Sequence, residues 1–295
     1  MGGRTMKLKQ GASGKGKQGA SGKGKQAGKA RAGGGGFLRT LLMLVWLGLV
    51  AFVAYEYVRL PDAEPLLKQN PKTTALIEQR TDEAREEGHK PRRKQSWVGL
   101  SGVSRHAIDA VLLSEDASFY LHEGVDTKEL ENALEDAVRK GKLGRGASTI
   151  TQQLAKNLWL STDRSLLRKA KELVLAHRLE TELPKNRILA LYLNVVEWGN
   201  GVYGIEAAAR EHFGISASQL SPAQGALLAA MLPAPRKRLL TSGSAALKKR
   251  AHWVIEQMEA VRRIDASQAR AAHAEIDELL SGKKADEPED AADGA

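Results

Sequence analysis

The chain has 295 residues, a formal net charge of +10 and no cysteine. Without cysteine, disulfide bonds and thiolate metal sites are excluded. Residues 1–40 hold ten Lys and Arg and no acidic residue, so the 35 basic residues that remain equal the 35 acidic ones. The net charge therefore belongs to the N-terminal tail.

Residues 1–36 form this tail, which repeats Gln-Gly-Ala-Ser-Gly-Lys-Gly-Lys at 10–17 and 18–25 and ends in four glycines. Because it has almost no apolar surface to bury, we predict a disordered basic tail. Such a tail can bind nucleic acid. Its position beside an apolar segment favours anionic lipid instead, and no nucleic-acid partner is expected.

Residues 37–58 are apolar apart from Arg39, Thr40 and Glu56. At about 1.5 Å per residue a helix of this length reaches roughly 30 Å, the thickness of a bilayer core. A cleaved signal peptide is the alternative, but no small-x-small cleavage site follows the apolar run. We predict an uncleaved transmembrane anchor, with the basic tail in the cytoplasm and the rest of the chain outside.

The remainder is predicted to be mainly α-helical. Residues 59–96 are rich in Pro, Lys, Arg, Glu and Gln and are predicted to be a juxtamembrane connector. Residues 97–262 show helical apolar spacing and no strand alternation, which indicates one catalytic domain. Residues 263–295 are predicted to be a C-terminal extension that ends in a disordered acidic tail, and we assign it no function. Helices are predicted at 166–183, 187–196, 204–213 and 221–231.

Glu115 is a candidate catalytic acid or base because it lies on an apolar stripe. Ile108, Val111, Leu112, Glu115 and Phe119 recur at three- and four-residue steps, which is one face of an amphipathic helix. Burial disfavours the charged form and raises the pKa of such a carboxylate. Its neighbour Asp116 points about 100° away and is expected to be more solvated. An ordinary helix-end acid is the alternative.

A helix is also predicted to start after Thr149. Thr149 and Gln152 have capping-box spacing, and a helix N-terminus beside a Gly-rich turn favours anions. Ser148, Gln152 and Lys156 follow at four-residue steps and line one face. The pattern is not a nucleotide-binding P-loop. A polar, solvated face is the alternative.

Arg164, Arg168 and Glu172 follow at the same four-residue step. Taken alone, Arg168 and Glu172 can be an ordinary surface pair worth about 0.3–0.5 kcal/mol. Together with a desolvated carboxylate and Lys156 they suggest glycosyl transfer from a lipid diphosphate, since cations stabilise the leaving group while the carboxylate accepts a proton.

Four ordered blocks carry a family resemblance across residues 97–262. They read Glu-Asp-x-x-Phe-x-x-His-x-Gly-x-Asp, Gly-x-Ser-Thr-Ile-Thr-Gln-Gln-Leu-x-Lys-Asn, Arg-Lys-x-x-Glu and Lys-x-x-Ile-Leu-x-x-Tyr-Leu-Asn. The chain resembles the peptidoglycan glycosyltransferases of family 51, and its length resembles the monofunctional members. One departure is Ala190, where the family usually has Glu, which leaves the role of that acid open. Ser281-Gly-Lys-Lys284 matches Ser-x-x-Lys without the other transpeptidase motifs.

The resemblance implies a lysozyme-like, bilobal helical domain that polymerises lipid II into β-1,4 glycan with inversion and release of undecaprenyl diphosphate. By resemblance Glu115 is the general base, and Glu172 positions the donor or a metal. Lys156 and Arg164, with help from Arg168, neutralise the diphosphate. The implied sugar or phosphate contacts are Ser148, Gln152 and Asn157. The implied supporting residues are Asp116, Phe119, His122, Gly124, Asp126 and Thr149.

No cofactor is expected to be obligatory, and Mg²⁺ or Mn²⁺ at the diphosphate is the metal that the resemblance allows. The expected partners are lipid II, the growing glycan, the bacterial plasma membrane and other cell-wall synthesis proteins. Two rival functions stay open. A lytic enzyme of similar fold needs one acid and no cations around a leaving diphosphate, and a membrane-tethered scaffold leaves Glu115 on an apolar face unexplained.

Overall fold

The computed structural model describes residues 34–140, 148–160, 165–238, 240 and 244–282. The chain divides into two units, residues 1–58 and 59–295. The predicted disordered ends, within 1–36 and at the close of 263–295, fall mostly outside the described residues.

The first unit contains helix α1 (Gly34–Val58), which begins three residues before the apolar segment predicted from the sequence. Residues 36–58 contain an 18-residue window with a mean hydropathy of 2.2 and form the one helix, within the described part of the chain, that is long and apolar enough to cross a membrane. The prediction of one candidate spanning helix is confirmed.

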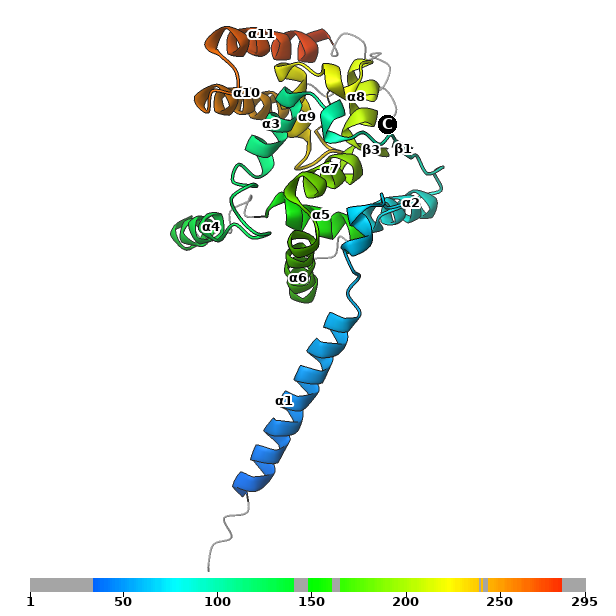
Figure 1. The fold of residues 1–295 in the computed structure, drawn as a ribbon, viewed down its shortest axis with the longest axis vertical. Coiled ribbons are helices and arrows are strands. Elements are labelled where there is room, and N and C mark those ends of the chain that lie inside the picture. Colours follow the sequence, from blue (N-terminus) through cyan, green and yellow to red (C-terminus); the bar gives the residue numbers. More distant parts are fainter. Residues whose placement is uncertain (1–33, 141–147, 161–164, 239, 241–243, 283–295) are drawn as a thin grey trace, which may run out of the picture. The chain divides into compact units, whose positions relative to one another are not determined.

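The second unit is mainly α-helical, as predicted, and its elements are labelled in Figure 1. Each helix predicted beyond residue 165 is found to within two residues at either end. The helices are α2 (Ala75–Glu86), α3 (Arg105–Glu115), α4 (Thr127–Lys140), α5 (Ile150–Trp159), α6 (Leu166–Glu182), α7 (Lys185–Val195), α8 (Ile205–Phe213), α9 (Pro222–Met231), α10 (Ala245–Ala260) and α11 (Ala266–Gly282). Short 3-10 turns lie at Glu64–Leu67, Leu100–Gly102 and Ala217–Gln219.

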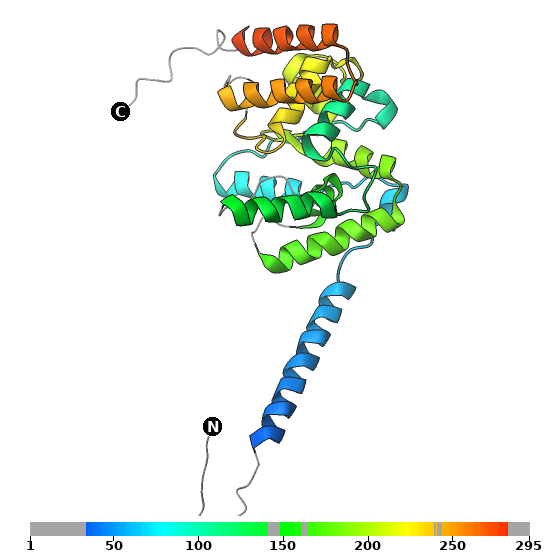
Figure 2. The same ribbon diagram turned by 90° about the vertical axis from the view of Figure 1, so that its left-hand side faces the viewer.

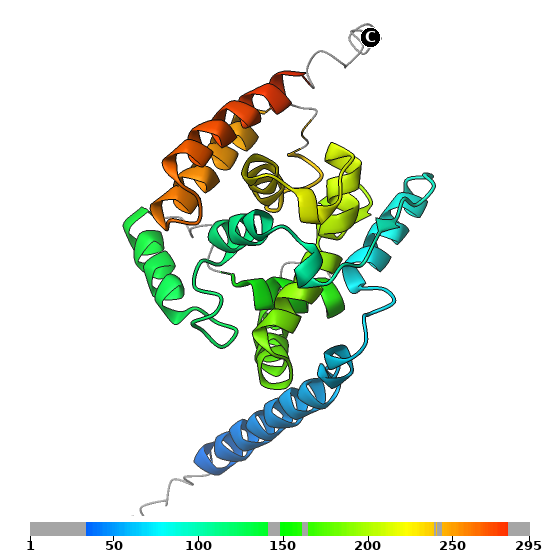
Figure 3. The same ribbon diagram turned by 45° about the horizontal axis from the view of Figure 1, so that its top comes forward.

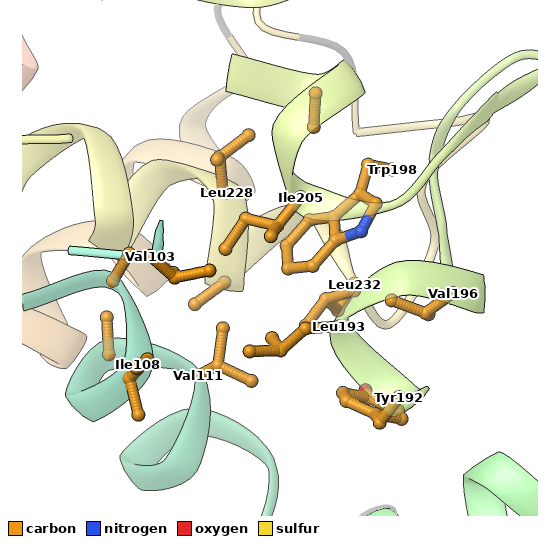
Figure 4. Packing of buried hydrophobic residues seen from close by; sticks show 14 of the residues in the cluster. Val103, Ile108, Val111, Tyr192, Leu193, Val196, Trp198, Ile205, Leu228 and Leu232 are labelled. Carbon is orange, nitrogen blue, oxygen red and sulfur yellow. The ribbon is translucent and has the colours of Figure 1, made fainter. Parts of the chain in front are cut away.

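Helix α9 is the centre of the core. It packs against α3, α10 and α11, which lie beside it in Figure 3. Its small side chains allow this, since a Cβ added to Gly225 would come within 2.9 Å of the Ala107 Cα on α3. Its first turn is fixed by Ser221, whose hydroxyl accepts the Gln224 N–H while the Gln224 side chain accepts the Ser221 N–H. Large side chains such as Trp198 and Tyr192 fill the surrounding space (Figure 4).

Helix α5 forms a second packing group with α2, α6 and α7. Helix α6 and the α10–α11 pair lie at opposite ends of the unit (Figures 1 and 2). The candidate site residues are divided between these two groups, because α3 and α10 belong to the first and α5 and α6 to the second. Packing of the two groups therefore decides the geometry of the site.

A small sheet corrects the expectation that strands are absent. It has the order β1 (Lys94–Gln95), β3 (Val202–Tyr203), β2 (Glu197–Gly199), with β1 parallel and β2 antiparallel to β3. Strands of two or three residues are too short to show a period of two in the sequence.

The segment 59–96, predicted as a connector, is packed structure. Ala63 and Leu66 are buried in the main core. Arg187 on α7 donates to the Leu66 carbonyl at 2.7 Å. Arg80 on α2 donates to the buried carboxylate of Glu197 at 3.0 Å. The segment is therefore part of the second unit, and its charged composition reflects surface positions around a few buried anchors.

The segment after residue 262 is also partly folded. Helix α11 packs against α9 and α10. Its buried side chains are Ala269, Ala272, Ile276 and Leu280. Helix α11 of the C-terminal extension therefore belongs to the hydrophobic core around α9.

Candidate active site

Glu115 is the last residue of α3 and is half-buried. Its Oε2 accepts the Gln153 Nε2 at 3.0 Å, and its Oε1 accepts the Ser114 hydroxyl at 3.3 Å. Burial raises the pKa of Glu115, and these hydrogen bonds and the charge of Arg250 act in the opposite direction. The direction predicted from the apolar stripe is confirmed, although Phe119 lies beyond the end of the helix.

Asp116 is more buried than Glu115, so the expectation that it is the more solvated acid is wrong. It is the C-cap of α3, with an extended φ of −165°, and the helical 100° step no longer applies. Its carboxylate accepts the Ile150 N–H at 2.9 Å and contacts the His122 Nε2 at 2.9 and 3.0 Å. Ile150 is the first residue of α5, so Asp116 is the anion at that helix N-terminus.

Thr149 caps α5 as predicted, since its hydroxyl accepts the Gln152 N–H at 3.2 Å. The same hydroxyl donates to the Gly124 carbonyl at 2.7 Å, which ties the helix start to the loop after α3. The expected capping box is incomplete. The Gln152 side chain instead accepts the Lys169 Nζ at 3.1 Å. Thr149 therefore caps the helix, while the Gln152 side chain belongs to the neighbouring ionic cluster.

The ionic cluster joins α5 to α6. Lys169 Nζ donates to the Ser148 hydroxyl at 3.2 Å and pairs with Glu172 Oε1. Arg168 Nη1 pairs with Glu172 Oε2 at 2.6 Å. Glu172 is 3% exposed, so this is not the ordinary surface pair that remained open in the sequence. Ser148, Gln152, Arg168 and Glu172 are brought together as the sequence suggested, with Lys169 at the centre.

The pKa of Lys156 reflects the charges of both candidate carboxylates. Burial lowers the pKa of Lys156, while the negative charges of Glu172 and Glu115 oppose the decrease. The positive charges of Arg168 and Lys169 lower the pKa of Lys156 further. Lys156 is therefore a desolvated cation that interacts electrostatically with both carboxylates. Asn157 beside it is buried. Arg164, also predicted to bind the diphosphate, lies outside the described residues.

A cavity of about 400 Å³ opens beside Glu115. Its wall includes the α3 end, the start of α5 and one side of α10. The lining residues are Leu113, Ser114, Glu115, Asp116, Ala117, Ser118, Asp126, Glu129, Ser148, Thr149, Trp253, Gln257 and Val261. Hydroxyl, amide and carboxylate groups around an aromatic side chain suit a sugar, because they offer hydrogen bonds to hydroxyls and an apolar face.

The other predicted supporting residues shape the loop after α3. Phe119 is buried and meets the His122 ring edge to face, with centroids 6.3 Å apart. Gly124 has a φ of +87°, and a Cβ there would approach the Ala176 carbonyl oxygen at 3.3 Å, so the chain passes close to α6. Asp126 accepts the Ser118 hydroxyl and the Glu129 N–H, and these bonds lower the pKa of Asp126.

Sequence reasoning missed four contacts of the site. Gln153 holds Glu115, and its own Oε1 accepts the Tyr192 hydroxyl at 3.0 Å. Burial raises the pKa of Tyr192 well above its usual value, so the hydroxyl stays a donor. Gln153 and Tyr192 lie in the second and fourth sequence blocks, and Lys169 lies in the third, so the blocks could have pointed to these three residues. Arg250 lies outside all four blocks, and no signal in the sequence pointed to it.

The residues around Glu172 do not fit a resident divalent metal. Within the described ranges no group of three or more His, Cys, Asp or Glu side chains is placed to hold a metal ion. Both Glu172 carboxylate oxygens already pair with cations, Oε2 with Arg168 and Oε1 with Lys169. Glu172 therefore has no unpaired carboxylate oxygen to offer a metal bound directly by the protein.

Comparison with known proteins decides the family. The family model described as transglycosylase matches residues 82–259. The chain belongs to the transglycosylase family. All four sequence blocks and Arg250 fall within the match, so the transglycosylase domain includes α10 as well as the predicted catalytic surface.

The transglycosylase relatives are similar over most of their length. The chain is 45% identical over 192 residues to a biosynthetic peptidoglycan transglycosylase of Herminiimonas arsenicoxydans, covering 65% of this chain and 83% of the relative. It is 42% identical over 226 residues to one of Alcanivorax borkumensis, covering 77% and 89%. A crystal structure of penicillin-binding protein 1A from Haemophilus influenzae aligns with a TM-score of 0.36 at 19% identity, over 63% of this chain and 18% of that one.

Proposed function

We propose that this transglycosylase is a peptidoglycan glycosyltransferase that polymerises lipid II into β-1,4 glycan strands for bacterial cell-wall synthesis. The observation that carries the proposal is the placement of Glu115. It is a half-buried carboxylate with a raised pKa at the edge of a polar cavity, and Lys156 links it electrostatically to the Glu172 cluster. One side of this arrangement accepts a proton, and the other side supplies positive charge.

In the proposed step, Glu115 takes the proton from the 4-hydroxyl of the acceptor sugar. The hydroxyl oxygen forms a bond to the anomeric carbon of the donor chain, and the bond from that carbon to the diphosphate oxygen breaks. The electron pair of the broken bond leaves with undecaprenyl diphosphate. Because the hydroxyl attacks from the face opposite the diphosphate, the configuration at the anomeric carbon inverts. A base with a raised pKa suits this role, since proton transfer is most efficient when the pKa lies near the working pH.

Positive charge is needed where the diphosphate leaves. Lys156 is desolvated, and a charge in a water-poor site stabilises a developing anion more strongly than one in water. Arg168 and Lys169 neutralise Glu172, so that Glu172 positions these cations and does not repel the diphosphate. A divalent cation, where one takes part, would be bound by diphosphate oxygens, and the proposal requires none.

Helix α1 supports a membrane location for the enzyme. We propose that it crosses the bacterial plasma membrane once, with residues 1–33 in the cytoplasm and the catalytic unit outside. Anchoring confines the enzyme to the surface that holds its lipid-linked substrate and raises the effective concentration. Interaction with other cell-wall synthesis proteins stays a prediction.

The test is polymerisation of fluorescent lipid II by the full-length protein in detergent. Wild type should yield glycan polymer, and Glu115→Gln should reduce the rate by at least about 100-fold because the amide cannot accept the proton. Glu278→Gln on the exposed face of α11 is the matched control and should behave as wild type. Shortening of preformed glycan by wild type, with no polymer from lipid II, would support the lytic alternative instead.

A further inference from the structure

Arg250 on α10 lies against the end of α3 that carries Glu115. Its Nη2 donates to the Ser114 carbonyl oxygen at 2.8 Å and to the Ser114 hydroxyl at 3.3 Å. Its guanidinium carbon lies 4.0 Å from the centre of the Trp253 ring, one turn further along the same helix. The guanidinium is thus held between a helix end and an aromatic face.

This contact completes the C-terminus of α3. The last carbonyl groups of a helix have no partner within it, and the helix end carries partial negative charge. Arg250 supplies both a donor and a positive charge there. Because Glu115 is the residue directly after Ser114, a bond that fixes the Ser114 carbonyl also fixes the backbone from which Glu115 projects.

A hydrogen-bond chain also runs from Arg250 to the Glu115 carboxylate. The Ser114 hydroxyl accepts from Arg250 and donates to Glu115 Oε1 at 3.3 Å. The charge of Arg250 lowers the proton affinity of Glu115 against the effect of burial, and the negative charge of Glu115 acts in turn on Arg250. We propose that Arg250 is a positioning residue that holds the end of α3 and favours the ionised form of the Glu115 carboxylate.

The other groups that act on Glu115 differ from Arg250 in charge or in their hydrogen-bond partners. Gln153 on α5 is a neutral donor, and Tyr192 on α7 acts through it. Lys156 on α5 contributes charge from the side of the ionic cluster. Arg238, after α9, adds a smaller effect than Arg250 and donates to the Ala230 carbonyl at 2.9 Å. Among the cations of the described segments, Arg250 is the one connected to Glu115 by hydrogen bonds through its backbone neighbour Ser114.

The inference deepens the proposed function and rests on it for the kinetic test. A general base works in its unprotonated form, so the rate falls as the pH falls through its pKa. Loss of a nearby positive charge raises the pKa of a carboxylate by about one unit or more. Arg250→Met should therefore move the acidic limb of the kcat profile upward by about one pH unit, with activity recovering at higher pH and little change in KM.

Two further variants separate charge from packing. Arg250→Lys keeps the positive charge but loses the planar fork, so its acidic limb should stay near that of wild type while its plateau is lower. Lys249→Met removes a charge from an exposed position on the same helix and should change neither limb. A rate loss for Arg250→Met that is equal at every pH and accompanied by a lower melting temperature would make Arg250 merely structural and overturn the inference.

A titration without turnover tests the same point. Glutamate labelled with carbon-13 in its side-chain carboxyl is introduced into full-length protein, and the Glu115 signal is assigned by its loss in Glu115→Gln. We expect the signal to titrate about one pH unit higher in Arg250→Met than in wild type. Identical titrations would overturn the inference. If wild type made no polymer, the proposed function would fail while this titration still decided the role of Arg250.

Discussion

Asp116→Asn should destabilise the fold while Glu115→Gln should remove the chemistry, although the two acids are adjacent. Asp116 is 8% exposed, and its two oxygens receive the Ile150 N–H and the His122 Nε2. An Asn side chain keeps one acceptor oxygen and places an amide group where the second oxygen accepts. The start of α5 and the loop after α3 would therefore share one acceptor.

The expected loss of unfolding free energy in Asp116→Asn follows from the number of hydrogen bonds that are lost. One hydrogen bond to a charged acceptor is worth about 1.5–3 kcal/mol, so the loss in unfolding free energy should be about 2 kcal/mol. For a domain of this size each kcal/mol corresponds to about 2–4 °C, and the melting temperature should fall by about 4–8 °C. Glu115 should behave differently, because burial already penalises its charge. A neutral amide there should leave the melting temperature unchanged or raise it.

The measurement is thermal unfolding by circular dichroism at pH 7.5, with lipid II polymerisation measured on the same samples well below the transition. Asp116→Asn should retain activity within about tenfold per folded molecule, while Glu115→Gln loses at least about 100-fold. An Asp116→Asn protein that melts as wild type does but cannot polymerise would refute the reasoning. It would make Asp116 a participant in the reaction and not a tie between α3 and α5.

Two further predictions concern Lys156 and Arg80. Since burial lowers the pKa of Lys156, Lys156→Arg should extend the basic limb of the kcat profile to higher pH, and an unchanged limb would assign it to another group. Arg80→Met should cost about 3 kcal/mol in chemical denaturation, because it leaves the 3%-exposed Glu197 without its cation. Burial raises the pKa of Glu197, so that loss should be larger at pH 8, where the carboxylate is charged, than at pH 5. Arg85→Met removes an exposed ion pair on the same helix and should have almost no effect.

The sequence by itself determined the features that depend on near neighbours. Thr149 is a helix cap because its hydroxyl reaches an N–H three residues away, and the chain between them is short enough to fix the geometry. The apolar spacing located the four helices between residues 166 and 231 and placed Glu115 on a buried stripe. The pair of Arg168 with Glu172 is also local, since both lie one helical turn apart.

Only the tertiary structure decided what Glu115 and Asp116 do. Asp116 is the more buried acid because an N–H of α5, 34 residues away, approaches the point where α3 ends, and no local pattern encodes that approach. Gln153 bonds to Glu115, and Arg250 bonds to the neighbouring Ser114, from separate helices for the same reason. Proton affinity depends on every charge and dipole within a few ångströms. Spacing can show that a carboxylate is buried, but only packing brings it the partners that set its charge.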